Sequence, residues 1–468
     1  MLQDDLLFRT VRELGELVRT RQISPVELTE SYLDRLERIG PRLNAVVTVT
    51  RERALAEARA AEREIAAGRY RGPLHGIPYG VKDLLATHGD PTTWGAAPYR
   101  DQVFDFDATV VRRLHDAGAV LIAKLAMVEL AGGMGYGQAN ASFTGPGRSP
   151  WNPTAWSGGS SSGPGSAVGA GLVGFAIGSE TSGSILTPSA FCGVTGLRPT
   201  YGRVSRAGAM ALSWTMDKLG PMTRSADDAG LVLAAIAGRD PADPSSVESA
   251  YAYPPESEPR RPYRLAVVKG STERGQDAVR RNFERAVEVL EEFAAFEEVE
   301  LPELPYGPVT GTIIGAEAAS AFEELIRSGR IHELTAPEDR IGGYARLTIL
   351  ATEYLRAMRA RPAIQRAFDD LTRRYDALVA PTRSTVANPV DVRFSEYFRG
   401  TGGPPIIPGS NVAGIPAIGV PNGFGERGLP TGIQFVGRAF EENRLIAIAR
   451  AYQSRTDWHR RRPPDPEP

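Results

Sequence analysis

Cysteine and lysine are nearly missing from this chain of 468 residues, and histidine is scarce. The single cysteine, Cys192, excludes an internal disulfide and a cysteine-based zinc site, and it is typical of a protein kept in a reducing cytoplasm. We expect it to be a small buried apolar residue. The five histidines show no spacing typical of metal ligands, so we expect neither a metal nor another cofactor.

The chain also lacks an excess of charge and a long apolar run. Its formal net charge of −2 gives no broad positive surface for nucleic acid or for an anionic membrane. Its longest Gly/Ala-rich apolar stretch, 166–178, is too short to span a bilayer. We therefore expect a small-molecule ligand, with no nucleic acid and no membrane as partner.

Arginine supplies almost all of the positive charge. Of 54 basic residues only four are lysine: Lys82, Lys124, Lys218 and Lys269. A lysine can lose its proton inside a protein and an arginine cannot, so these four are candidates for proton chemistry. Lys82 follows a strand-like run in GIPYGVKDLL, where burial would lower its pKa by up to ~3–5 units and make it a base. A solvated lysine at a strand end is the alternative.

Glycine and serine, by contrast, are concentrated in WSGGSSSGPGSAVGAG, residues 156–171. This stretch fits G-x-S-x-G around Ser161, the nucleophile elbow of one hydrolase class. The preceding residues favour turns rather than the strand that an elbow needs, and we expect His332 and His459 to be exposed surface residues. A phosphate-binding P-loop is excluded because the stretch contains no lysine.

A second cluster, GSETSGSILTPSAFCG, occupies residues 178–193. Small residues around Gly183 would let successive backbone N–H groups point into one cavity, as in an oxyanion hole. A plain Gly/Ser-rich turn before a helix is the alternative. Because a neutral lysine can activate a serine without histidine, sometimes through a second serine, the chain permits a serine hydrolase that uses Lys82.

Strand-like and helical runs alternate along most of the chain, which predicts an α/β fold. We expect one large α/β/α body with a mixed, largely parallel central sheet covered by helices. Near the start, Ser24, Pro25 and Glu27 form a capping box that predicts a helix. The predicted parts are a helical segment (1–70), a core with the site (71–237), a Pro/Ser-rich surface connection (238–263), and a second half completing the same domain and its pocket (264–468).

Four stretches taken together resemble the amidase signature family, in the right order and over nearly the whole chain. The family includes fatty acid amide hydrolase and the A subunit of glutamyl-tRNA amidotransferase. The resemblance implies one α/β/α body around a mixed sheet and a Ser–cis-Ser–Lys triad. The stretches are GIPYGVKDLL, GGSSSGPGSAVGAG, GSETSGSILTPSAFCGVTGLRPTYGRVSR and NVAGIPAIGVPNGFGERGLPTGIQFVGRAFEENRL.

The resemblance also implies roles for single residues. The family's lysine falls on Lys82, its cis-serine on Ser160 and its nucleophile on Ser184, while Ser161 is limited to a supporting hydrogen bond. The remaining family positions are backbone oxyanion donors and a substrate-lining loop, which fall on Thr181, Ser182, Gly183 and Ser184, and on GGMGYG with Gly133 and Met134.

Three positions beside the nucleophile depart from the family pattern G-T-D-x-G-G-S-I-R. Here Glu180 stands for the aspartate, Ser182 for a glycine and Leu186 for the arginine. The acid–arginine pair that the family usually has at this place is therefore absent or rebuilt.

The function that these residues predict is hydrolysis of a carboxamide C–N bond in a small linear amide, through an acyl-enzyme. We expect a cytoplasmic enzyme, with a homodimer as one option. Three alternatives stay open: a carbamate or ester hydrolase with the same triad, a glutaminase subunit that feeds ammonia to a tRNA-bound partner, and a glycine-loop binding protein without catalysis.

Overall fold

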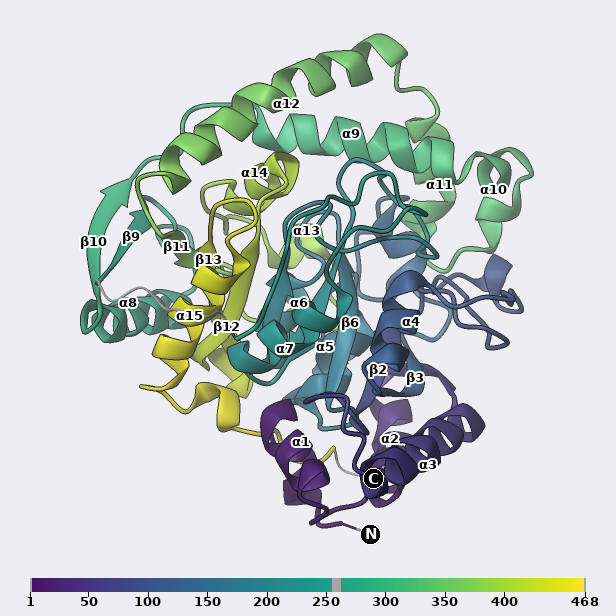
Figure 1. Cartoon of the computed structure of the whole chain (residues 1–468). Coiled ribbons are helices and arrows are strands. Elements are labelled where there is room, and N and C mark those ends of the chain that lie inside the picture. The colour runs from purple at the N-terminus through teal and green to yellow at the C-terminus, as the bar shows by residue number, and fades with distance from the viewer. Residues whose placement is uncertain (1, 255–261, 467–468) are drawn as a thin grey trace.

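An eleven-stranded sheet forms the centre of the protein, with helices on both of its faces (Figure 1). The computed structural model describes residues 2–254 and 262–466. Residues 255–261, which belong to the predicted connection 238–263, lie outside the described residues. The sheet contains strands from 71–237 and from the second half of the chain, and it also takes a strand, 46–49, from the segment 1–70 that was expected to be helical. The domain boundaries themselves stay a prediction.

The strands follow one another across the sheet in the order β1-β3-β2-β6-β8-β7-β12-β13-β11-β9-β10, and β4 pairs with β5 in a separate small sheet. Their bounds are β1 (Val46–Val49), β2 (Pro78–Lys82), β3 (Val120–Leu125), β4 (Arg148–Ser149), β5 (Asn152–Trp156), β6 (Phe175–Glu180), β7 (Thr195–Arg198), β8 (Lys218–Thr223), β9 (Tyr263–Val268), β10 (Ala294–Val299), β11 (Ala377–Pro381), β12 (Ala417–Phe424) and β13 (Pro430–Val436).

The predicted mixed α/β sheet is confirmed, although it is less parallel than the alternation of elements suggested. Parallel pairing joins β2 to β3 and β6, and it joins β9 to β10 and β11. The strands between these two groups pair antiparallel. One reason is the short turn 425–429 between β12 and β13, which is long enough for a hairpin and too short for a crossover.

Helices cover the sheet and close the molecule at both ends. In Figure 1, α9 and α12 arch over one end, and α1, α2 and α3 lie at the opposite end. Among the described residues, none of the helices is both long and apolar enough to cross a bilayer. The bounds are α1 (Val11–Arg19), α2 (Pro25–Leu43), α3 (Arg51–Ala66), α4 (Thr109–Asp116), α5 (Ser162–Gly169), α6 (Leu186–Cys192), α7 (Ala226–Ile236), α8 (Asp277–Glu291), α9 (Tyr306–Ala321), α10 (Glu323–Arg327), α11 (Pro337–Arg346), α12 (Ala351–Thr372), α13 (Phe394–Tyr397), α14 (Ile406–Ala413) and α15 (Glu442–Gln453).

The predicted capping box starts α2. The Glu27 N–H donates to Ser24 Oγ at 3.2 Å, and Glu27 Oε2 accepts from the Ser24 N–H at 3.1 Å. Further along the same helix, the buried Arg35 side chain forms ion pairs with Asp4 and with Asp465. This arginine therefore joins the two ends of the chain, which lie close together in Figure 1.

The short helix α5 explains why the chain has so much glycine between residues 156 and 171. A Cβ built on Gly163 would lie 2.3 Å from the Ala126 nitrogen and 2.4 Å from the Ala45 oxygen, and one on Gly165 would lie 2.9 Å from the Pro188 oxygen. The missing side chains let α5 pack backbone to backbone against α6 and the segment after β3. The loop before α5 is thereby fixed near the carboxyl ends of β2, β3 and β6, where ligands bind in parallel sheets.

Replacing Gly163 with alanine tests this close packing. We expect Gly163→Ala to lower the free energy of unfolding by about 1–3 kcal/mol, because backbone atoms cannot move aside as a flexible side chain can. The matched control is Gly311→Ala in α9, where an added Cβ would meet nothing within 4 Å. Thermal and urea unfolding should show the control unchanged or slightly more stable. Equal stability of the two variants would contradict the packing argument.

Candidate active site

Lys82 lies at the end of β2 with its side chain completely buried. Its Nζ donates to Ser160 Oγ at 2.7 Å and to Ser179 Oγ at 2.9 Å. The peptide bond between Gly159 and Ser160 is cis. The structure therefore brings together two of the three residues that the sequence assigned to the triad, and it confirms that Lys82 is removed from water.

Burial lowers the pKa of Lys82 from 10.5 to about 7, although the carboxylates of Asp217 and Glu180 oppose this shift. Burial also lowers the pKa of Lys124, but this lysine has a carboxylate directly against it, with Nζ 3.0 Å from Asp83 Oδ1. The Lys82 amine instead bonds to hydroxyl groups. Such a site holds a large neutral fraction near neutral pH.

Ser184 lies in the turn after β6, beside the loop that carries the cis peptide. The Ser161 N–H donates to the Ser184 carbonyl oxygen at 3.2 Å. Ser161 Oγ itself donates to the Ser179 carbonyl oxygen at 3.1 Å, so this hydroxyl is used within the protein. In the described structure no hydrogen bond joins the hydroxyls of Ser160 and Ser184, and catalytic hydrogen bonds are often long before substrate binds.

Glu180 organises the turn that carries Ser184. Its Oε2 accepts from the backbone N–H groups of Ile185 at 2.8 Å and Leu186 at 3.0 Å. Its Oε1 accepts from Arg198 Nη1 and from Asn411 Nδ2, both at 2.9 Å. Burial alone would raise the pKa of Glu180, but Arg198 and these hydrogen bonds hold it below its usual range. The acid–arginine pair is therefore rebuilt, with its arginine supplied by β7.

The residues between Glu180 and Ile185 keep free backbone donors. Among the described residues, no hydrogen bond is made by the N–H of Ser182, Gly183 or Ser184. Gly183 has a φ of +86°, a left-handed conformation that glycine adopts without strain. The turn therefore has the donors that an oxyanion hole needs, and their role stays a prediction.

Two side chains of the loop GGMGYG, Met134 and Tyr136, contact different parts of the structure. Met134 is buried under α11, and a Cβ on Gly342 would lie 1.8 Å from the Met134 oxygen. Tyr136 approaches the cis peptide instead, since a Cβ on Gly159 would lie 3.2 Å from its hydroxyl oxygen. A substrate contact by Gly133 and Met134 stays a prediction.

Two expectations from the sequence are wrong. His459 is buried rather than exposed, and burial lowers its pKa to about 4. A strand, β5, does precede Ser161, but it lies in the separate small sheet with β4, bridges to Pro389 through Ala155, and ends at Trp156. Since four residues, 157–160, separate this strand from Ser161, the chain does not run straight from strand into serine as a nucleophile elbow requires. His332 is exposed as expected.

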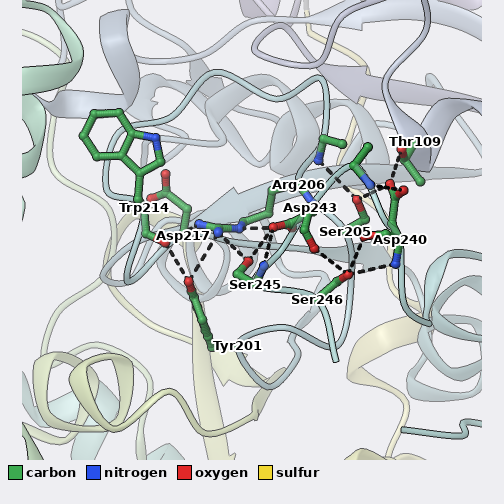
Figure 2. A network of polar contacts seen from close by, with 12 residues as sticks. Thr109, Tyr201, Ser205, Arg206, Trp214, Asp217, Asp240, Asp243, Ser245 and Ser246 are labelled. Atoms are coloured by element: carbon green, nitrogen blue, oxygen red, sulfur yellow. Dashed lines mark hydrogen bonds and ion pairs between the residues drawn. The ribbon is translucent and has the colours of Figure 1, made fainter. Parts of the chain in front are cut away.

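A cavity of about 240 Å³ opens beside Ser179 and Thr181. Its wall includes Arg206, whose guanidinium contacts several neighbouring residues, as Figure 2 shows. Arg206 Nη1 donates to the Trp214 carbonyl oxygen at 2.7 Å, and its Nε lies 3.6 Å from Asp243. The remaining surface is mostly apolar, including Leu84, Met210, Leu212 and Leu219.

Metal-binding groups are not gathered in the part of the chain that the structure describes, where no three His, Cys, Asp or Glu side chains are placed to share an ion. Cys192 is buried as predicted, and burial raises the pKa of its thiol well above the usual value.

Three polar residues of the site were not found by sequence reasoning. Ser179 belongs to the second serine cluster and lies one position before the last residue of β6. Recognising this strand in the sequence would have placed Ser179 near its carboxyl end, as a candidate site residue. Asp217 and Arg198 come from strand ends far along the chain, and no local pattern marks them. Asp217 accepts from Thr181 Oγ1 at 2.6 Å.

Comparison with known proteins identifies the family of this chain. A sequence model of the family "Amidase" matches residues 27–446. The chain belongs to the amidase family. It is 38% identical to the A subunit of glutamyl-tRNA(Gln) amidotransferase from Moorella thermoacetica, over 98% of this chain and 99% of that protein. It is 40% identical to the putative amidase AmiD of Mycobacterium tuberculosis, over 97% of this chain and 95% of that protein.

The fold comparison agrees with this assignment. The native peptide amidase of Stenotrophomonas maltophilia superposes with a TM-score of 0.82 at 33% identity, covering 98% of each chain. The protein is therefore a hydrolase that acts on carbon–nitrogen bonds, with the amidase signature fold.

The buried ion pair at the nucleophile turn can be tested by a double-mutant cycle. We expect Glu180→Gln to lower the free energy of unfolding by about 3–5 kcal/mol, because it leaves the Arg198 guanidinium buried without a counter-charge. Adding Arg198→Met should recover part of that loss, measured by urea unfolding. Strictly additive effects of the two substitutions would show that the pair is not coupled.

Proposed function

We propose that this amidase cleaves a carboxamide through Ser184 as nucleophile, Ser160 as proton relay and neutral Lys82 as base. The observation that supports it best is the Lys82 amine, which is buried, has a pKa of about 7 and bonds to a serine hydroxyl on a cis peptide. An amine of this kind accepts a proton from a hydroxyl at neutral pH, as a general base must.

The reaction would run in two halves. Lys82 takes the Ser160 proton while Ser160 takes the Ser184 proton, and Ser184 Oγ attacks the carbonyl carbon. The free N–H groups around Gly183 stabilise the oxyanion, and one such donor typically contributes ~10²–10³ in rate. When the C–N bond breaks, the proton returns through Ser160 to the leaving nitrogen. Water then attacks the Ser184 ester by the same relay and releases the acid.

The alternatives of a glutaminase subunit and of an ester or carbamate hydrolase differ from this proposal in substrate and leaving group. One relative, at 38% identity, is part of an amidotransferase, which favours a glutaminase that works with a partner protein. One structural neighbour is a peptide amidase, which favours a single chain that acts alone. Turnover of simple amides by the purified chain, with none on glutamine, would argue against the glutaminase. Matched ester, carbamate and amide substrates separate the leaving groups.

The base is tested by substitution at position 82. We expect Lys82→Arg to be as inactive as Lys82→Ala, because arginine keeps its charge at any pH that the protein survives. Amide turnover gives the rate, and covalent labelling by a fluorophosphonate reports on Ser184 directly. Ser184→Ala should show neither turnover nor labelling. Near-normal turnover by Lys82→Arg would remove lysine from the mechanism.

The pH dependence follows from the same residue. Below a pH of about 7 the Lys82 amine is protonated and cannot accept a proton, so kcat/KM should fall as the pH decreases through that value. Above it, the neutral form predominates and kcat/KM should level off. The rate of fluorophosphonate labelling should follow the same curve, since it needs the same activated hydroxyl. A flat profile through neutrality would exclude Lys82 as the base.

A further inference from the structure

A second cavity, of about 330 Å³, lies beyond the carboxyl ends of β9 and β11. The segment 398–408, which leads into α14, closes it from another side, and Gln434 of β13 forms part of its wall. The lining residues used below are Thr382, Arg383, Phe398, Ile407 and Gln434.

This cavity shares a wall with the turn that carries Ser184. Ile407 lines the cavity, and its Cγ2 would lie 3.3 Å from a Cβ on Gly183. The same helix, α14, supplies the Asn411 amide that bonds to Glu180. The cavity therefore lies directly beside the nucleophile turn, with Ile407 between them.

Three polar atoms in the lining have no partner in the described structure. Thr382 Oγ1 and Gln434 Oε1 are buried without a hydrogen bond, and so is Arg383 Nε. Gln434 uses its Nε2 to donate to the Pro381 carbonyl oxygen, so its Oε1 is left as an acceptor. Because Thr382 is 2% and Gln434 is 0% exposed, Arg383 is the residue of these three that a molecule in the cavity can reach.

Arg383 is the one charged side chain among the described residues that line this cavity. Its guanidinium lies 5.5 Å from the centre of the Phe398 ring, and no carboxylate among the described residues pairs with it. Burial lowers its pKa, and the group that opposes this is the Tyr136 hydroxyl rather than an acid. Arg206, in the other cavity, has Asp243 as its counter-charge.

A partly buried guanidinium without a counter-ion is unfavourable, and a carboxylate is the planar group that matches its donors. We propose that the cavity binds a carboxylate on the substrate, with Arg383 as its counter-ion, so that the protein acts on amides that carry an acid group. This inference rests on the proposed function.

The carboxylate can belong to the acyl half or to the amine half of the amide, and two substrate pairs separate these cases. The first compares the half-amide of a dicarboxylic acid with an alkanamide of equal length. The second compares an N-acyl amino acid with the corresponding N-acyl alkylamine. For one pair we expect kcat/KM of the wild-type protein to be about 10- to 100-fold higher for the charged member, mainly through KM.

Substitution of Arg383 should remove this preference. In Arg383→Met the ratio of charged to neutral substrate should fall to near one, and in Arg383→Lys it should be partly kept. The matched control is Arg399→Met, since Arg399 is exposed on the same segment and does not line the cavity. It should leave the ratio unchanged. The wild-type ratio decides the matter even where Arg383→Met does not fold.

The outcomes distinguish this inference from the proposal on which it rests. If a fluorophosphonate does not label Ser184 of the wild-type protein, the proposed function fails. If it labels Ser184 and both substrate pairs give a ratio near one, or favour the neutral member, the carboxylate site alone is wrong. An equal loss for charged and neutral substrates in Arg383→Met would also overturn it, because it would indicate a structural role.

Discussion

The exclusion of water from the Lys82 amine is the constraint on which the rest of the site depends. Lowering the pKa of this amine from 10.5 to about 7 disfavours its charged form by roughly 5 kcal/mol. Two serine hydroxyls suffice as partners for a neutral amine, whereas an ammonium ion would need a carboxylate. The carboxylates of Asp217 and Glu180 lie near enough to oppose the shift without abolishing it. Burial, partly opposed by these acids, therefore sets the pH at which the base works.

Both acids accept hydrogen bonds from other groups of the protein. Asp217 accepts from the Thr181 hydroxyl and from the backbone N–H groups of Leu212 and Ser213. Glu180 accepts from Arg198, from Asn411 and from the first turn of α6. Each carboxylate is thereby held in place and stabilised by donors other than Lys82. The same bonds fix both ends of the nucleophile turn, so the electrostatics of the base and the geometry of the turn come from one network.

Features that depend on neighbouring residues could be predicted from the sequence. The capping box at Ser24 and the strand that ends at Lys82 follow from local patterns, whereas the glycine-rich helix after Ser161 was not predicted. The burial of Lys82 could also be predicted, because the chain uses arginine for almost all of its positive charge and the four lysines are therefore candidates for proton chemistry. The family resemblance added Ser160 and Ser184 as candidates, and the structure places both in loops next to each other.

Contacts between distant segments could not be predicted in this way. Arg198 of β7 takes the place of a family arginine whose position, Leu186, begins α6, and only the pairing of β7 with β8 and β12 brings it to Glu180. The antiparallel centre of the sheet has the same origin, since alternation of helices and strands does not reveal which strands become neighbours. His459 is buried although it stands in an Arg/Pro-rich tail, because that tail packs back against Arg224.

The two cavities beside the nucleophile turn show how charge separates structural from binding arginines. Arg206 and Arg383 both line open space next to the site, yet Arg206 donates to Trp214 and Ser245 and forms an ion pair with Asp243. A paired guanidinium of this kind holds its loop in one conformation and offers little to a ligand. Arg383 lies against an aromatic ring instead, which supports the side chain without neutralising its charge. An unpaired cation that lines a cavity is stabilised when an anion binds beside it, and that gain is what a binding site for an acid needs.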